Sequence, residues 1–326
     1  MAAYTNTIID QTALFDEQMM ATVAAYDSKA PLPPLVRNPY LRRLDAFTRE
    51  ALQNPVHTLA SLFCGGGGLD LGLSFAGFGT RVCSDVAPVF VDTVVHNVPH
   101  AVGLPGNAMD LTGAQLVAAA GTETLDLVAA GPPCQAFSIL GRRGALDDPR
   151  GMLALKYMEL VAEIKPRAFL FENVPGLLTV NGGADWTRLR EYARQVTGYH
   201  LHWKKLNSAS FGIPQYRERV VLVGFREDTP FEFPTVPTGP GATELMIEGQ
   251  LATPSAWALE ALDGLPNHNI RLHGDRVTKR YNIIPQGGRD ATDHTDRIHP
   301  LRPSGTVLVG SSAGGEDHIF THSSRE

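Results

Sequence analysis

The sequence predicts an α/β fold in which a parallel, Rossmann-like sheet is covered by helices on both faces. Short apolar runs such as TLASLF, TRVCSD, LDLVAAG and AFLFEN alternate with segments long enough to form helices. Continuous apolar runs of about five to seven residues are typical of strands that are buried on both faces. Residues 151–165 illustrate a connecting helix, because apolar residues recur there at spacings of three and four before Pro166 ends the segment.

Changes in composition divide the chain into four parts. Residues 1–56 contain the stiff PLPP element and a charged stretch, and we expect them to form an N-terminal helical arm. Residues 57–225 carry the apolar runs of the α/β domain. The segment FEFPTVPTGPGATE is rich in Pro, Gly and Thr, which predicts a boundary near residue 226. A small irregular module is then expected over residues 226–290, followed by a last segment over residues 291–326.

The overall composition limits the class of protein. The 326 residues include 28 Lys and Arg against 34 Asp and Glu, so any nucleic acid must be bound by local basic patches. One such patch is predicted within residues 186–226, where eight Lys and Arg accompany two acidic residues. The cysteines Cys64, Cys83 and Cys134 show no CxxC spacing, which argues against a disulfide framework and a metal site. Because the sequence shows no signal peptide and no apolar membrane span, we expect a cytoplasmic protein without a membrane partner.

A glycine-rich turn, CGGGGLDLG, follows the first predicted strand at residues 59–63. Backbone N–H groups in such a turn can approach a ligand closely, and the helix that follows favours a negatively charged group at its N-terminus. A tight turn that only packs helix against strand explains the same pattern. Asp85 ends the next strand about 20 residues later, where an acidic residue commonly accepts hydrogen bonds from ribose hydroxyls. Both NAD and S-adenosylmethionine carry that ribose, so the turn does not choose between them.

Two later strand ends carry residues suited to covalent chemistry. The run LDLVAAG leads into GPPCQAFSILGRRG, in which two prolines fix the backbone ahead of Cys134. A lone cysteine is more often a buried small side chain, but a rigid turn followed by a basic loop favours a nucleophile. The strand AFLFEN brings Glu172 and Asn173 to its carboxyl end, beside Cys134 if the two strands are neighbours. A glutamate that caps the next turn from solvent is the simpler alternative.

The motifs FCGGGGLDLG, GPPCQAFS, FENVPGL and QYRER resemble, in order and spacing, those of the DNA (cytosine-5) methyltransferase family. The resemblance covers roughly residues 57–225 and resumes at about residues 281–326. It implies the Rossmann-like sheet of S-adenosylmethionine-dependent methyltransferases, with a small target-recognition module at residues 226–290. It also implies methyl transfer from S-adenosylmethionine to carbon 5 of cytosine in double-stranded DNA, in a bacterial modification system. The cofactor would leave as S-adenosylhomocysteine, and no metal is implied.

The resemblance assigns roles to five catalytic residues. Cys134 would add to carbon 6 of cytosine and so make carbon 5 nucleophilic. Glu172 would hold or protonate ring N3, and Asn173 would fix that carboxyl and its loop. Arg217 and Arg219, two apart and therefore expected on one face of a strand, would meet the cytosine carbonyl, the glutamate and a DNA phosphate. The family flips the base out, because a stacked base cannot be reached.

The resemblance further implies two sets of binding residues. The expected cofactor contacts are Phe63, Gly65, Gly67, Leu69, Asp85, Val86, Asn107, Ala108, Gly131 and Pro133. The expected DNA contacts are Gln135, Ser138, Arg142, Arg143, Gln215, Lys279 and Arg280. Asp85 stands where the family usually has glutamate, and Asn107 stands where an aspartate usually accepts from the adenine amine, with Asp110 as a neighbouring alternative.

The chain departs from the family pattern in its last segment. Residues 291–326 contain the RPSGT element and are expected to return to the catalytic domain, but the final helix and Asn-Val element of the family are absent. Since that element completes the cofactor pocket, we expect a split enzyme whose second subunit supplies it. Truncation, or compensation by residues 1–56, are the other interpretations.

Three alternative functions stay open on the sequence alone. A branch of the same family methylates transfer RNA, although FSILGRRG and the basic module after QYRER favour DNA. A non-catalytic nucleic-acid-binding subunit is a second alternative, against which the intact Cys134, Glu172 and both arginines speak. A nicotinamide dehydrogenase would share the fold but would leave PPCQ and ENV unexplained.

Overall fold

The computed structural model describes residues 48–98, 100–133 and 149–234, together with short pieces between residues 246 and 306. The chain divides into two compact units. The larger unit consists of Asp45–Leu206 and Glu218–Pro234, and the smaller unit contains Asn207–Arg217 and the pieces beyond residue 234. Among those pieces, β8 (Met246–Ile247) pairs antiparallel with β9 (Gln250–Leu251).

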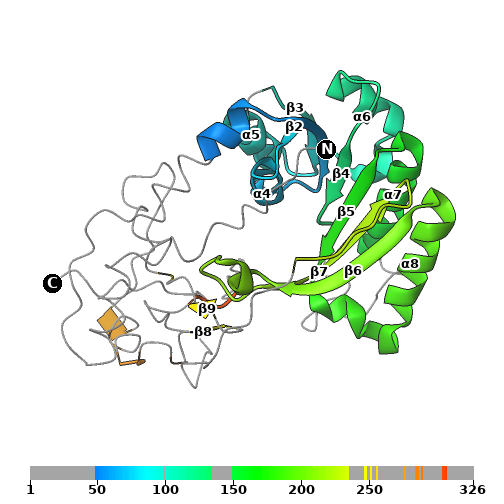
Figure 1. The fold of residues 1–326 in the computed structure, drawn as a ribbon. Coiled ribbons are helices and arrows are strands. Elements are labelled where there is room, and N and C mark those ends of the chain that lie inside the picture. The colour runs from blue at the N-terminus through cyan, green and yellow to red at the C-terminus, as the bar shows by residue number, and fades with distance from the viewer. Residues whose placement is uncertain are drawn as a thin grey trace. The chain divides into compact units, whose positions relative to one another are not determined.

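A seven-stranded sheet forms the centre of the larger unit (Figure 1). Its strands are β1 (His57–Leu62), β2 (Phe78–Asp85), β3 (Val102–Pro105), β4 (Leu127–Ala130), β5 (Ala168–Asn173), β6 (His200–Asn207) and β7 (Glu218–Phe225). The strand order is β3-β2-β1-β4-β5-β7-β6. The five strands from β3 to β5 are parallel, which confirms the predicted α/β class, but β7 runs antiparallel to β5. The chain reverses before β7, because residues 208–217 join β6 to β7 without a crossover helix.

Helices cover both faces of this sheet. Figure 1 shows α4 (Gly68–Ser74) and α5 (Pro88–Asn97) on one face and α6 (Gly113–Ala120), α7 (Pro149–Ile164) and α8 (Ala184–Thr197) on the other. Short 3₁₀ segments follow β3, β5 and β6: η1 (Ala108–Asp110), η3 (Pro175–Leu178), η4 (Val180–Gly183) and η5 (Ser208–Phe211). The helix predicted at residues 151–165 is confirmed as α7.

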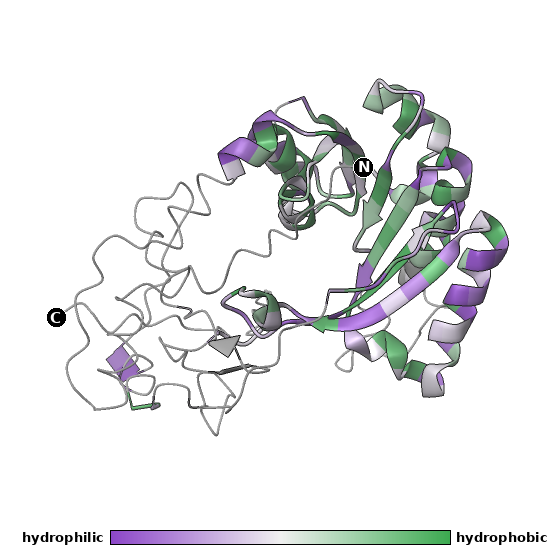
Figure 2. Ribbon diagram, viewed as in Figure 1, coloured by the Kyte–Doolittle hydropathy of each residue, from purple (hydrophilic) through white to green (hydrophobic). Residues whose placement is uncertain are grey.

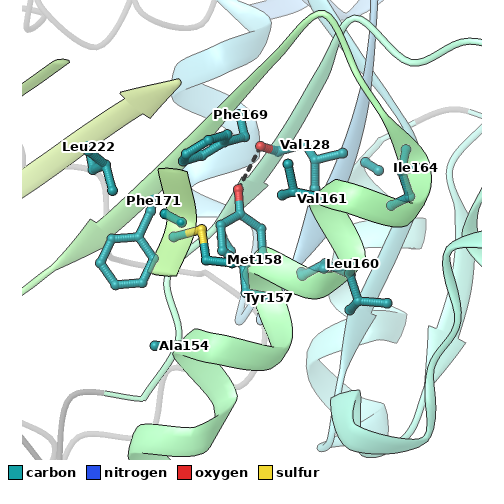
Figure 3. Close-up of a cluster of buried hydrophobic side chains, with 14 of the residues drawn as sticks. Val128, Ala154, Tyr157, Met158, Leu160, Val161, Ile164, Phe169, Phe171 and Leu222 are labelled. Atoms are coloured by element: carbon teal, nitrogen blue, oxygen red, sulfur yellow. Dashed lines mark hydrogen bonds between the residues drawn. The ribbon is translucent and has the colours of Figure 1, made fainter. Parts of the chain in front are cut away.

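The main hydrophobic core lies between the sheet and α6, α7 and α8. In β5, Phe169 and Phe171 belong to this core, whereas the alternate residue Leu170 packs toward the α4 face. Tyr157 of α7 is fully buried, and its hydroxyl lies 2.9 Å from the Val128 carbonyl oxygen and 3.0 Å from that of Leu170 (Figure 3). One tyrosine thus holds α7 to both β4 and β5, the two strands that precede the PPC and ENV motifs.

The distribution of hydropathy agrees with this layered arrangement. Figure 2 shows hydrophobic residues concentrated in the central strands, with hydrophilic residues along α8 and in the middle of β6. This pattern is typical of a sheet buried on both faces, whose outer helices present a polar side to solvent.

Candidate active site

The carboxyl ends of β1, β2, β4 and β5 meet at one edge of the sheet, because these strands are parallel. Ligands of open α/β sheets bind at this edge. The glycine-rich turn and the PPC turn follow β1 and β4, whereas Asp85 and the first two residues of ENV are the last residues of β2 and β5. The candidate site is built from these four strand ends.

The glycine-rich turn connects β1 to α4. Phe63 has φ 53°, an uncommon value for a residue with a side chain, and Gly65 and Gly67 have φ 51° and 84°. A Cβ added to Gly67 would lie 3.1 Å from Val94, so a side chain there would crowd α5, whereas Gly65 has open space around its Cα. Leu69, in the first turn of α4, packs into the core beside β1 and β4. The turn therefore leaves open space beside Gly65, while the N–H groups of Gly65 and Gly67 are bonded to Asp85 and to the Cys64 carbonyl.

Asp85 ties the acidic strand end to this turn. Its Oδ2 accepts a hydrogen bond from Gly65 N–H at 3.0 Å, and its Oδ1 accepts one from Ala87 N–H at 3.1 Å. Each carboxylate oxygen has more than one lone pair, so these bonds orient the group without exhausting its capacity to accept ribose hydroxyls. Val86, immediately after it, is 72% exposed and presents an apolar surface at the same edge.

Asn107 and Ala108 follow β3. The Asn107 Oδ1 accepts from Met109 N–H at 3.0 Å and caps η1, while Ala108 is buried. The amide oxygen expected to meet an adenine amine is therefore already oriented by the backbone, and Asp110 lies at the end of the same short segment.

The PPC and ENV turns are joined by a buried hydrogen bond. Asn173 is 1% exposed, and its Nδ2 donates to the Pro132 carbonyl at 3.2 Å while its Oδ1 accepts from Val174 N–H at 2.9 Å. Pro132 is buried and Pro133 is exposed. These bonds hold the start of the ENV loop and the backbone two residues before Cys134, and neither of them reaches the Glu172 carboxyl.

Glu172 lies between the ends of β4 and β7. Its Oε1 is 2.8 Å from Arg219 Nε, and a Cβ added to Gly131 would come within 3.3 Å of its Oε2. The Glu172 side chain is 26% exposed and the Arg219 side chain 17%. The expected pairing of glutamate and arginine is present, and Gly131 is the residue that leaves room for the carboxylate.

Gln215, Tyr216 and Arg217 of QYRER belong to the smaller unit, whereas Glu218 belongs with Arg219 to the larger one. β7 begins at Glu218, so Arg219 is its second residue and Arg217 immediately precedes the strand. Arg217 N–H donates to the Asn207 side chain and its carbonyl accepts from Ser208 N–H, bonds that hold it in the connection after β6. Gln215 pairs with Ser304 of the RPSGT element in a parallel bridge.

A buried polar cluster beneath the turn was not predicted. Asp70 of α4 is 1% exposed and accepts from Ser61 Oγ and from Thr80 Oγ1, each at 2.8 Å. Burial raises the pKa of Asp70, although both hydroxyl bonds act in the opposite direction. An acidic residue inside the otherwise apolar LDLGL segment was the available sequence signal.

Two of the three cysteines are shielded from solvent by burial. Cys64 and Cys83 are buried with Val91 and Val94 in a small apolar cluster. Contact with Cys83 and burial raise the pKa of the Cys64 thiol, and a thiol that does not ionise is a poor nucleophile.

Several predicted site residues lie outside the described part of the chain. These are Cys134, Gln135, Ser138, Arg142, Arg143 and Arg280. Lys279 is described and is exposed.

The basic residues within residues 186–226 are partly engaged inside the protein. Lys205 pairs with Glu218 at 2.8 Å, and Arg226 donates to the Lys165 carbonyl at 2.8 Å. The guanidinium of Arg190 lies 5.3 Å from the Trp186 ring centroid and 5.7 Å from that of Trp203. These contacts fix the positions of the three side chains, but each keeps its positive charge, so the local excess counted from the sequence is unchanged.

The described residues fit S-adenosylmethionine at the glycine-rich turn. The turn offers open backbone at Gly65 and Gly66, and a carboxylate stands at the adjacent strand end. Within the described part of the chain no group of three or more His, Cys, Asp or Glu is arranged to hold a metal ion. No helix among the described residues is long and apolar enough to cross a membrane.

Comparison with known proteins identifies the family. The family model for C-5 cytosine-specific DNA methylase matches residues 57–293. The type II methyltransferase M.AquIA of Picosynechococcus is 36% identical over 219 residues, which cover 64% of this chain and 88% of that protein. The type II methyltransferase M1.HphI of Haemophilus parahaemolyticus is 31% identical over 248 residues, covering 75% of this chain and 65% of that protein.

A solved structure supports the fold. A DNA modification methyltransferase encoded within a prophage of E. coli superposes with a TM-score of 0.59 at 21% identity, covering 77% of this chain and 82% of that one. At this identity the likeness concerns the fold alone. The family is assigned from the match to the family model, because that match includes the glycine-rich turn, the PPC motif and the ENV motif. The chain belongs to the C-5 cytosine-specific DNA methylase family, the DNA cytosine-5 methyltransferases.

Proposed function

We propose that this chain methylates carbon 5 of cytosine in double-stranded DNA, with S-adenosylmethionine as the methyl donor, as a cytoplasmic modification enzyme of a type II system. The observation that carries the proposal is the joining of the PPC and ENV turns at one sheet edge, through the Asn173 bond to Pro132 and the Glu172 pair with Arg219. The type II methyltransferases among its relatives support the choice of DNA as substrate.

The proposed reaction begins with Cys134, which directly follows the fixed Pro-Pro turn. Its thiolate adds to carbon 6 of cytosine, and the electron pair of the C5–C6 double bond moves toward carbon 4 and N3, which leaves an enamine whose carbon 5 is nucleophilic. When bound, S-adenosylmethionine supplies the methyl group that carbon 5 accepts. Loss of the carbon 5 proton and departure of the thiolate then restore the aromatic ring. The target cytosine must leave the base stack for this chemistry, so base flipping is part of the proposal.

Glu172 is proposed to hold ring N3 during the attack by Cys134. Negative charge develops on the ring as the thiolate adds, and a carboxyl group that holds or gives a proton at N3 offsets it. The Arg219 bond to Oε1 restricts the orientation of this carboxyl, and Gly131 gives it space. Preorganised polar groups of this kind act without reorganisation during the reaction.

The cofactor is proposed to lie over the glycine-rich turn. Phe63, Gly65 and Gly67 would line it, and Asp85 would accept from its ribose hydroxyls. Val86 would provide apolar contact for the adenine, and the oriented Asn107 oxygen would accept from the adenine amine. The remaining predicted contacts are Leu69 in the first turn of α4, the buried Ala108 of η1, and Gly131 and Pro133 directly after β4.

The test is a methyl-transfer assay with labelled S-adenosylmethionine on two substrates, unmethylated bacterial DNA and transfer RNA. Because a second subunit is among the expected partners, the chain is assayed alone and with host-cell extract. We expect label in DNA as 5-methylcytosine, and its loss by about 100-fold or more in Glu172→Gln. Glu159→Gln is the matched control, since this carboxylate of α7 is exposed and accepts a bond from Tyr192. Label confined to transfer RNA, or equal activity in the two variants, would refute the proposal.

A further inference from the structure

The buried Asp70 cluster joins three elements around the glycine-rich turn. Ser61 is the second-last residue of β1, Asp70 lies in the first turn of α4, and Thr80 lies in β2. Both hydroxyl-to-carboxylate distances are 2.8 Å, and all three side chains are at most 4% exposed. Buried polar groups that are fully paired specify one arrangement of the elements that carry them.

The Ser61 bond closes the chain on either side of the turn. Residues 62–69 lie between Ser61 and Asp70, so this one bond spans the whole glycine-rich segment. Gly67 N–H donates to the Cys64 carbonyl at 3.0 Å inside the closed segment. The length of chain that must take up the turn conformation is thereby held at both ends.

An irregularity in β2 aims Thr80 at the same carboxylate. The β1–β2 register pairs Leu59 with Thr80 but Ala60 with Val82, so Arg81 is an extra residue in β2. In a regular strand, residues 80 and 83 would point to opposite faces of the sheet. Because of the extra residue, Thr80 points to the same face as Cys83, which is the face that α4 covers. Bulges re-aim side chains next to active sites, and this one supplies the second partner of Asp70.

The closed segment contains strained backbone. Phe63 has φ 53°, a left-handed conformation that favours glycine and that persists in other residues only where the surroundings enforce it. Phe63 is followed by Gly65 and Gly67, also with positive φ. The Ser61–Asp70–Thr80 cluster provides an enforcing contact on both sides of this strained turn.

From these observations we propose that Asp70 is a positioning residue for the methyl-donor site, which sets the conformation of the glycine-rich turn through Ser61 and Thr80. The inference rests on the proposed cofactor position, but it makes a separate claim about the turn itself. Without the cluster, the turn should sample other conformations, and cofactor binding would then have to select the competent one.

A matched control exists at the opposite end of the same strand. Thr58, the second residue of β1, donates from Oγ1 to Asp126 Oδ2 at 3.0 Å. This bond also joins a β1 hydroxyl to a carboxylate, but it lies at the amino end of the sheet, away from the turn. Thr58→Val therefore removes the same kind of bond and leaves the Ser61–Asp70–Thr80 cluster unchanged.

The experiment compares Ser61→Ala, Thr80→Val and Asp70→Asn with Thr58→Val and the unchanged chain. Thermal unfolding first shows that each variant is folded. Hydrogen exchange of the unliganded protein then follows the amides of residues 63–68, and calorimetry measures S-adenosylmethionine binding. We expect faster exchange at the turn and roughly 2- to 30-fold weaker cofactor binding in the three cluster variants, a range typical of coupling through packed networks. Thr58→Val should lose stability without either effect.

The outcomes separate this inference from the proposed function. If cluster variants and Thr58→Val show the same exchange at residues 63–68, the cluster is merely structural and the inference is wrong. The same conclusion follows if exchange rises but cofactor affinity stays that of the unchanged chain. If the unchanged chain binds no S-adenosylmethionine, the proposed cofactor fails, while the exchange data still decide whether Asp70 positions the turn.

Discussion

Arg219 Nε and Glu172 Oε1 lie 2.8 Å apart at the point where β7 begins beside the end of β5. The pair is formed across an antiparallel strand junction, with both side chains more than two-thirds buried. Arg219 therefore acts on the ENV carboxylate from a strand that is distant in sequence, and the geometry of this ion pair makes a direct prediction about catalysis.

Arg219→Ala should reduce the single-turnover methylation rate by roughly 10²- to 10³-fold, as expected when one preorganised donor is removed. Cofactor affinity should not change, because Arg219 lies at the β5–β7 end of the site. Lys205→Ala is the control, since it breaks the exposed 2.8 Å pair with Glu218 and should alter stability by less than about 1 kcal/mol. Equal rates in the two variants would contradict the role assigned to Arg219.

Asn173→Ala should lower the free energy of unfolding by roughly 1–3 kcal/mol, because it leaves the buried Pro132 carbonyl without its donor. Asn173→Asp keeps an acceptor for Val174 N–H but removes the donor to Pro132. Both variants should therefore lose activity if the Pro132 bond places Cys134. Urea unfolding and methylation rates measure the two effects, and full activity in Asn173→Asp would show that the bond is not needed.

Tyr157→Phe removes a hydroxyl that serves two buried carbonyl oxygens, those of Val128 and Leu170. A buried polar group that loses its hydrogen-bond partner destabilises the folded protein by about 1–3 kcal/mol, so the free energy of unfolding should fall by that amount. Urea denaturation of both proteins provides the test. An unchanged midpoint would mean that water replaces the hydroxyl between β4 and β5.

The stability contributed by Asp126 should depend on pH. Burial alone would raise the pKa of Asp126, but the hydrogen bonds from Thr58 and Arg167 and the nearby His57 outweigh it and lower the pKa below 3.8. A carboxylate with a lowered folded-state pKa stabilises the protein above its unfolded value, and this contribution disappears as pH falls through the folded value.

The unfolding free energy of the unchanged chain should therefore exceed that of Asp126→Asn above pH about 4, and the difference should shrink on further acidification. Urea unfolding of the two proteins across this range measures it. If the difference in unfolding free energy between the two proteins grew toward acidic pH, folding would raise the pKa of Asp126 instead of lowering it.

Local sequence patterns were sufficient to predict individual strands and helices. AFLFEN is the strand β5, with its polar end at Glu172 and Asn173, and the periodic segment before Pro166 is α7. In both cases residues close in sequence decide the structure, because apolar continuity or periodicity and a proline stop act within one segment.

Contacts between distant segments could not be predicted in the same way. Thr80 reaches Asp70 only because of the bulge in β2, and bulges leave little trace in a single sequence. Arg217 and Arg219 look equivalent in QYRER, but β7 begins between them, where the chain changes from the smaller to the larger unit. The antiparallel insertion of β7 beside β5, which pairs Arg219 with Glu172, is likewise set by topology.

The most direct test of the central claim is covalent trapping on DNA that contains 5-fluorocytosine. Fluorine cannot be lost from carbon 5 as a proton is, so the enzyme remains bound to carbon 6 after methyl transfer. In a preparation that binds S-adenosylmethionine, we predict a denaturation-resistant complex whose adduct maps to the peptide containing Cys134, and no complex in Cys134→Ala. A complex that persists in Cys134→Ala, or cytosine-5 methylation without any adduct, would contradict the account.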